Sequence, residues 1–148
     1  MLMFGKAGVC DLLVNSLVAS ITRGILGATR MVLKIGNRQL ENGVTVIEIG
    51  GRIALGRESR SIEPELAGVL KTGCKMVIMD LAGVTHIDST GIGIMAYCFG
   101  KATQAGTELR ISGAKSNVFE VFQITRLVHV VPFFPDVDSA LQGNGRLV

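Results

Sequence analysis

The sequence predicts an α/β domain, in which helices pack on a mixed sheet of four to five strands. Strand-like and helix-like segments alternate along residues 31–148 with short connections, which is the pattern of a sheet covered by helices. Residues 76–79 are all apolar, as expected of an inner strand that is covered on both faces. The chain has 148 residues, 19 of them glycine, which indicates one domain with many tight turns.

The first two strands are expected to form a hairpin. Residues 33–40 alternate loosely between apolar and polar positions, and residues 44–49 do so more regularly. Between them, residues 41–43 read Glu-Asn-Gly, a sequence that favours a tight turn. The glycine pair at 50–51 then predicts a break in the second strand, which resumes briefly at Ile53.

A helix is expected next, capped by Ser59 or Ser61 and ending at Gly73. The apolar strand at 76–79 follows this helix. Residues 80–83 are expected to carry the chain from that strand into a loop.

A second helix is predicted at about 92–104, between a strand at 76–81 and another at 108–111. Because strand–helix–strand crossovers are right-handed, these two strands are expected to run parallel. The loop at 84–90 then lies at the carboxyl edge of the sheet. That edge is the usual place of function in open α/β sheets.

The last third of the domain is expected to contain two helices and one strand. Ser116 is expected to cap a third helix, and residues 128–131 resemble a last short strand. A short final helix is predicted to begin at Asp136 or Asp138 and to end near residues 142–143.

Residues 1–30 differ from the rest of the chain. Apolar side chains recur there every four residues, which predicts an amphipathic helix: Val9, Leu13, Leu17, Ile21 and Ile25. The apolar stretch is too short to span a membrane, and no cleavage site of a signal peptide closes it. Two interpretations stay open. Either Met31 is the natural start and residues 1–30 are a translated extension, or the helix packs on the domain at 31–148 or mediates a homodimer.

Composition excludes several classes of function. The net charge is +3 and the basic residues are scattered without interleaved aromatics, so we expect no nucleic-acid binding. Three separated cysteines, Cys10, Cys74 and Cys98, fit a reducing, cytoplasmic compartment, and Cys98 is expected in the core. His86 and His129 have no partners at metal-ligand spacing, so no metal or other cofactor is expected.

The segment 88–93, Asp-Ser-Thr-Gly-Ile-Gly, is the strongest candidate for a functional site. Ser89 and Thr90 stand where a helix cap is expected, and a cap alone is the simpler interpretation. However, three adjacent oxygen-bearing side chains exceed what one cap requires. Gly91 and Gly93 remove side chains from the first turn, which lets a partner come close. A phosphate on Ser89 is also favoured by the positive end of the helix dipole.

Catalytic interpretations of this segment are weaker. The Asp-Ser/Thr-Gly motif of aspartic proteases fails because two residues separate Asp88 from Gly91. A Ser-His-Asp triad would have to recruit His86 or His129, and no G-x-S-x-G elbow is present. The chain also has no phosphate-binding loop of the G-x-x-x-x-G-K-[ST] type. We therefore expect a binding protein rather than an enzyme.

Residues 32–141 resemble the STAS family, the anti-sigma factor antagonists of bacteria. The most specific match is the strand at 77–81, VIMDL, followed by IDSTGIG at 87–93. In that family an apolar strand ending in Asp-Leu leads into D-S-[ST]-G-[LI]-G. Further matches are Gly-Arg-Ile at 51–53 and Gly-Thr-Glu-Leu at 106–109. The resemblance implies a STAS fold with its helices on one side of a mixed sheet.

The resemblance also implies a regulatory function in sigma-factor-dependent transcription. The unphosphorylated antagonist binds an anti-sigma factor that is a serine kinase, and this releases the sigma factor. Phosphorylation of the serine matching Ser89 abolishes binding, and a PP2C-type phosphatase restores it. On this basis the residues expected to contact the partner are Asp88, Thr90, Gly91, Ile92, Gly93, Ala54 and Gly56.

One departure from the family pattern concerns the partner. Many members carry an aspartate after the hairpin that helps to contact the kinase, and the chain has Ala54 at that position. The loss of this carboxylate removes a charge-assisted contact with a basic partner. The alternative function is a constitutive STAS subunit of a lipid-transport ABC complex or of a stressosome-like assembly.

Overall fold

The structure, a computed structural model, describes residues 33–147 of the chain. The predictions for residues 1–30 lie outside the described residues. Among the described residues, no helix combines the length and the hydrophobicity that are needed to cross a bilayer.

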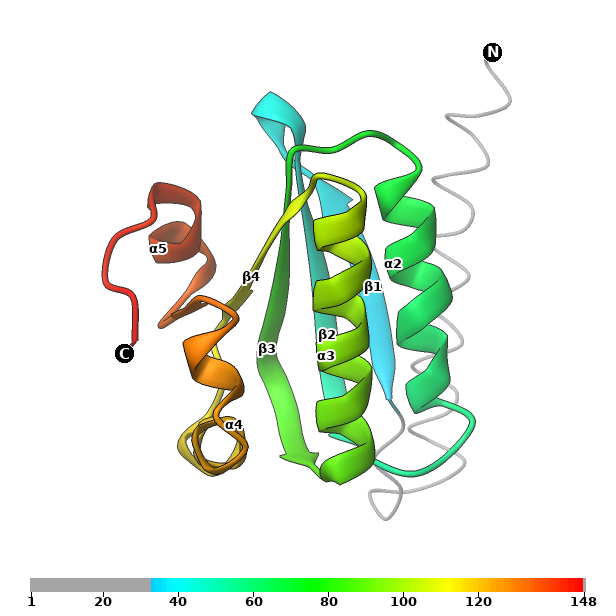
Figure 1. The fold of residues 1–148 in the computed structure, drawn as a ribbon, viewed down its shortest axis with the longest axis vertical. Coiled ribbons are helices and arrows are strands. Elements are labelled where there is room, and N and C mark those ends of the chain that lie inside the picture. Colours follow the sequence, from blue (N-terminus) through cyan, green and yellow to red (C-terminus); the bar gives the residue numbers. More distant parts are fainter. Residues whose placement is uncertain (1–32, 148) are drawn as a thin grey trace, which may run out of the picture. The chain divides into compact units, whose positions relative to one another are not determined.

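The domain is built on one mixed sheet, as the sequence predicts (Figure 1). Its strands lie in the order of the chain: β1 (Lys34–Gln39), β2 (Val44–Ile53), β3 (Met76–Ile87), β4 (Glu108–Ser112) and β5 (Phe133–Phe134). β1 pairs antiparallel with β2, and the pairs from β2 to β5 are all parallel. The hairpin and the parallel pairing around the central crossover are therefore confirmed.

The hairpin turn is a short 3-10 helix, η2 (Glu41–Gly43). Asn42 and Gly43 have φ angles of 65° and 75°, a left-handed conformation that these two residue types adopt more readily than most others.

The expected break at 50–51 does not occur, because β2 continues to Ile53 with two register shifts against β3. At the first shift Gly50 faces Gly83, and a Cβ atom on Gly83 would lie 3.0 Å from the Gly50 Cα. The glycines thus allow the two backbones to approach closely where the strands bend.

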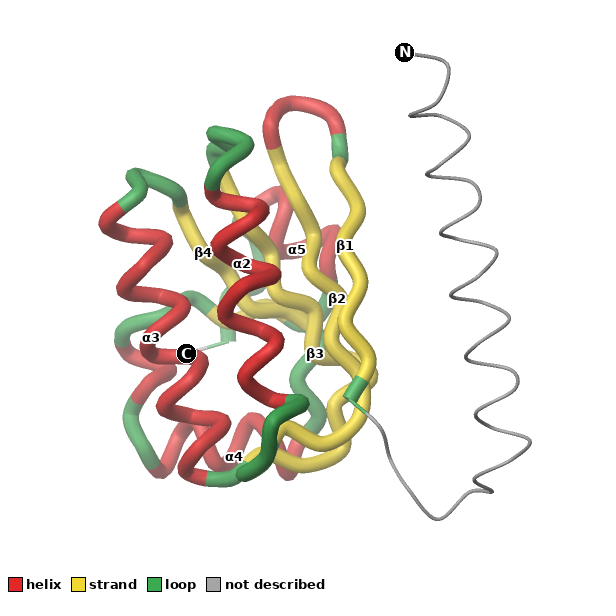
Figure 2. Tube along the Cα trace, turned by 90° about the vertical axis from the view of Figure 1, so that its right-hand side faces the viewer, coloured by secondary structure: helices red, strands yellow, loops and turns green. Residues whose placement is uncertain are grey.

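Three helices cover one face of the sheet: α2 (Ile62–Leu70), α3 (Ser89–Gln104) and α4 (Ser116–Ile124). Figure 2 shows α2 and α3 side by side along this face. The main core lies between them and the sheet, and alternate strand residues such as Ile47, Val77 and Met79 are fully buried in it. Phe122 of α4 packs against Phe133 of β5, with ring centroids 4.8 Å apart.

A fourth helix, α5 (Val137–Gln142), packs on the opposite face of the sheet. Ala140 belongs to one buried cluster with Val46 and Ile78, whose side chains point away from the main core because successive strand residues alternate faces. The expectation that all helices lie on one side is therefore wrong. β2 and β3 are apolar at consecutive positions because both of their faces are covered.

Three local predictions need correction. Residues 128–131 do not form the last strand: a 3-10 helix, η4 (Leu127–His129), occupies that region, and the strand is β5. Ser116 does not cap α4, because Lys115 holds the cap position without a side-chain bond. Ser61 occupies the predicted cap position of α2, but its side chain makes no capping bond, and Ser59 lies in a preceding 3-10 helix, η3 (Ser59–Ser61). The final helix begins as predicted, with the Asp136 side chain accepting a bond from the Ser139 N–H.

Cys98 lies in the core, fully excluded from solvent, as the sequence predicts. Burial, with a smaller contribution from the charge of Glu63, raises the pKa of its thiol to about 12. Since the thiolate is the reactive form, we expect Cys98 to resist iodoacetamide at neutral pH in the folded protein and to react after unfolding in urea. Peptide mapping by mass spectrometry checks this, and rapid labelling of native Cys98 would contradict the packing described here.

Candidate functional site

The site is built where β3 passes directly into α3. The expected loop at 84–90 is largely absent, because β3 continues to Ile87 and α3 begins at Ser89. The extension is held by β2, whose last residues Arg52 and Ile53 pair with His86 and Ile87. The only residue between strand and helix is Asp88. Ser89 is therefore the first residue of a 16-residue helix, at the carboxyl end of a central strand.

Asp88, rather than Ser89 or Thr90, is the cap of α3. Its Oδ1 atom accepts a hydrogen bond of 3.0 Å from the Gly91 N–H, and its Oδ2 atom accepts one of 3.1 Å from the Leu55 N–H. These backbone donors, with a contribution from Arg52, lower the pKa of the Asp88 carboxyl, because they stabilise its charged form. Asp88 thus joins the start of α3 to the loop that follows β2.

Ser89 is exposed, and Thr90 is half-buried. Among residues 33–147, no group accepts a hydrogen bond from the Ser89 hydroxyl. Because Asp88 already caps the helix, the Ser89 side chain is not needed for that role. Its hydroxyl is open to another molecule.

The two glycines of the first turn have different environments. Gly91 is buried, and a Cβ atom there would lie 2.6 Å from Ile87 Cγ1 and 2.8 Å from the Ile53 carbonyl oxygen. Its lack of a side chain therefore serves the packing of α3 on the sheet, which corrects the expectation that it leaves space for a partner. Gly93 is exposed with no atom within 4 Å of a Cβ position, and Ile92 is half-buried against the core.

The loop from Ala54 to Gly56 lies beside the start of α3, and both are at the same end of the domain (Figure 1). The buried Ser59 side chain holds Ala54 twice: it accepts a 3.0 Å bond from the Ala54 N–H and donates a 2.6 Å bond to the Ala54 carbonyl. Leu55 projects from this loop and is 82% exposed. Sequence reasoning missed Leu55, although a large apolar residue between Ala54 and Gly56 was a usable signal.

The structure therefore brings together two segments that are more than 30 positions apart in the chain. Asp88, Ser89 and the exposed Gly93 lie on α3 or at its start, and Ala54 and Gly56 lie on the neighbouring loop, where Gly56 is exposed. Exposed residues of both segments thus lie close together at one end of the domain. Within residues 33–147, no three His, Cys, Asp or Glu side chains converge to hold a metal ion.

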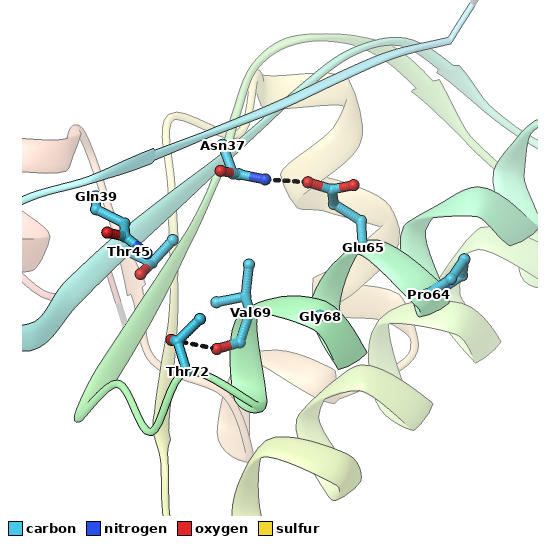
Figure 3. Close-up of a pocket in the computed structure, with 8 residues that line it drawn as sticks. All are labelled: Asn37, Gln39, Thr45, Pro64, Glu65, Gly68, Val69 and Thr72. Carbon is cyan, nitrogen blue, oxygen red and sulfur yellow. Dashed lines mark hydrogen bonds between the residues drawn. The ribbon is translucent and has the colours of Figure 1, made fainter. Parts of the chain in front are cut away.

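A separate shallow groove of about 170 Å³ lies between β1 and α2 (Figure 3). Its walls are mostly polar, and the Asn37 amide donates a hydrogen bond to the Glu65 carboxylate within it. On the α2 side, the Thr72 hydroxyl donates a 2.6 Å bond to the Val69 carbonyl. None of the residues predicted as a functional site lines this groove.

Proteins of two Listeria species are similar to part of the chain. The chain is 32% identical over 66 residues to the anti-sigma-B factor antagonist of Listeria monocytogenes, which covers 45% of this chain and 57% of that protein. The protein of the same name from Listeria innocua matches equally. The chain thus spans little more than half the length of the curated relatives it matches.

Solved structures share the fold at low identity. A crystal structure of an anti-sigma factor antagonist from Mycobacterium paratuberculosis has a TM-score of 0.66 and 19% identity, and covers 75% of this chain and 92% of that one. The Bacillus cell fate determinant SpoIIAA in its phosphorylated form has a TM-score of 0.57 and 14% identity, with coverages of 74% and 97%. The STAS domain model matches residues 37–140, which is most of the chain, and the chain therefore belongs to the STAS domain family.

Proposed function

We propose that the chain is an anti-sigma factor antagonist. It binds an anti-sigma factor that is a serine kinase, and phosphorylation of Ser89 ends this binding, so that the phosphorylation state of one residue regulates sigma-factor-dependent transcription. The observation that carries the proposal is the exposed Ser89 hydroxyl at the first position of α3, beside the loop that Asp88 holds. A PP2C-type phosphatase is the proposed enzyme that reverses the modification.

The surroundings of Ser89 explain how one phosphate can act as a switch. A phosphoserine carries about −1.5 to −2 charges at neutral pH. The Asp88 carboxylate already accepts the Gly91 N–H, so it competes with the phosphate for the backbone donors of the first turn. The added charge therefore faces outward. It repels a partner whose surface is acidic, and an apolar partner surface could bind only if the phosphate lost its water, which costs free energy.

The relatives support the proposal by their names. The Listeria proteins are called anti-sigma-B factor antagonists, and one protein of this fold is described in a phosphorylated form. The motif around Ser89 in this chain contains the serine, the following threonine and both glycines that the family pattern has.

Intact mass spectrometry tests the proposal. The full chain is incubated with ATP and, one at a time, the purified anti-sigma-type kinases of the same genome. We expect one phosphate per chain with one of these kinases. The Ser89→Ala variant should take up none, and the matched variant Thr90→Ala should still take up one. Phosphate on the Ser89→Ala variant, or none on the wild-type chain with any of the kinases, would refute the proposal.

A second candidate function is a constitutive subunit of a lipid-transport ABC complex or a stressosome-like assembly. Ala54 favours it, because the kinase-contacting carboxylate of many family members is missing there. Copurification from native cells separates the two functions. A transporter ATPase or a large scaffold as the main partner, with unmodified Ser89, supports this second function.

A further inference from the structure

The segment that carries Leu55, from the end of β2 into η3, combines positive charge with exposure. Residues 52–60 contain three arginines, Arg52, Arg57 and Arg60, against one glutamate, Glu58. All three arginines are exposed, and none of them forms an ion pair with another residue of the described range 33–147. The net positive charge of this segment is therefore available to a partner.

Leu55 lies between Arg52 and Arg57 in the chain, and its apolar side chain is exposed. The backbone on its N-terminal side is fixed, because the Ser59 side chain bonds to Ala54 and the Asp88 carboxylate accepts the Leu55 N–H. A side chain on a fixed backbone loses less conformational freedom on binding than one on a mobile loop. Large apolar side chains that enter a desolvated pocket contribute most of the affinity in many interfaces.

We infer that this surface, consisting of Leu55 and Arg52, Arg57 and Arg60, docks onto an acidic protein surface that has an apolar pocket for Leu55. The inference deepens the proposed function and rests on it, because the acidic surface is assigned to the kinase partner. In many family members an aspartate at the position of Ala54 contacts a basic partner. In the contact inferred here the charges are reversed: the chain is basic and the partner is acidic.

The sign of the proposed switch supports an acidic partner. A phosphate on Ser89 would attract a basic surface and would strengthen its binding. The same phosphate repels an acidic surface and also neutralises the arginines beside it. Arg52 is near enough to Asp88 to contribute to its electrostatics, so it lies within the reach of a charge placed on the next residue. Charge repulsion alone is therefore sufficient to release an acidic contact after phosphorylation.

The test measures the affinity of the full chain for the kinase that phosphorylates Ser89, by calorimetry with ADP so that no phosphate is transferred. Ala54→Asp restores the carboxylate found in many family members. We expect this variant to bind about tenfold more weakly, whereas a basic partner would bind it more tightly. The double variant Arg57→Glu/Arg60→Glu is expected to lose about tenfold or more, with a larger loss at low ionic strength.

Leu55→Ala is expected to lose about tenfold in affinity. Its matched control is Ile124→Ala, which truncates an apolar side chain that is 75% exposed on α4 and should bind normally. The control for the charge reversals is Lys71→Glu/Lys101→Glu. It makes the same change in net charge at exposed positions near the far ends of α2 and α3.

Three outcomes overturn the inference. Tighter binding of Ala54→Asp, or unchanged binding of the double arginine variant, excludes an acidic partner surface. Binding of the chain to phosphatidylglycerol vesicles that the arginine variant abolishes, with kinase binding intact, assigns the surface to membranes instead. A parallel incubation of the same proteins with ATP, followed by intact mass spectrometry, reports on the proposed function separately. A phosphorylated Ser89 with normal binding of all variants overturns the docking surface alone, and an unmodified Ser89 overturns both.

Discussion

Replacing Gly91 with alanine is expected to lower the free energy of unfolding by about 2 to 3 kcal/mol, because overpacking a tight core position costs this much. The new Cβ atom would lie 2.6 Å from Ile87 Cγ1, 2.8 Å from the Ile53 carbonyl oxygen and 2.9 Å from Ile53 Cγ2. A side chain can rotate away, but the Ile53 carbonyl is part of β2 and accepts the Asp88 N–H. α3 must therefore shift from the sheet.

Gly93→Ala is the matched control for this variant. Gly93 lies two positions further along the same helix and is exposed, with nothing within 4 Å of the added atom. Since alanine favours helices over glycine, this variant should be more stable than wild type by about 0.5 to 1 kcal/mol. Urea unfolding followed by circular dichroism measures both variants. Equal stability of the two would mean that α3 does not pack on β2 as described.

Replacing Asp88 with alanine is expected to cost about 2 kcal/mol of stability, the upper range for a lost helix cap, because a second bond is lost with it. The Gly91 and Leu55 N–H groups both lose their acceptor in this variant. Asp88→Asn keeps one oxygen that can accept the Gly91 N–H, but its amide nitrogen cannot accept the Leu55 N–H, so it should lose about half as much at neutral pH. A similar loss in both variants would show that the bond to Gly91 alone does not stabilise the start of α3.

The contribution of the Asp88 charge should disappear in acid. Because the folded-state pKa of Asp88 is lowered from its ordinary value of 3.8, its contribution is fully present above that value. It is lost as the pH falls through the lower folded-state pKa. The stability difference between wild type and Asp88→Asn is therefore expected to shrink below pH 3.8, as measured by urea unfolding across this range.

The parts of the fold that could be predicted depend on local patterns. The hairpin follows from alternating residues around a Glu-Asn-Gly turn at 41–43, and Asn42 and Gly43 have the positive φ angles that such a turn uses. The parallel pair β3 and β4 follows from one apolar strand, one helix and the handedness of crossovers. Neither prediction needs knowledge of distant contacts.

The predictions that failed depend on tertiary pairing. The loop expected at 84–90 follows Ala82 and Gly83, which have low strand propensity, yet β2 lies beside this segment and its pairing extends the strand to Ile87. In the same way β5 is only two residues long, and its position is determined by pairing with β4. Valines at 128–131 gave a stronger local strand signal at the wrong place.

In the candidate site, too, the local features could be predicted and the tertiary contacts could not. The exposure of Ser89 at a helix start agrees with the sequence pattern, since the helix boundary and its caps are local features. The link from Asp88 to Leu55 spans 33 positions and could not be deduced from spacing. The packing role of Gly91 was also hidden, because only the fold shows that Ile53 and Ile87 meet at that point.

The direct joint between β3 and α3 has a consequence for any enzyme that modifies Ser89. Most of the backbone next to this residue is already engaged, by strand pairing up to Ile87 and by helical bonds from Ser89 onward. The serine cannot be drawn out as an extended peptide without local unfolding. A modifying enzyme must therefore accept an intact, rigid corner of the domain, and it selects its target by three-dimensional shape rather than by a linear recognition sequence.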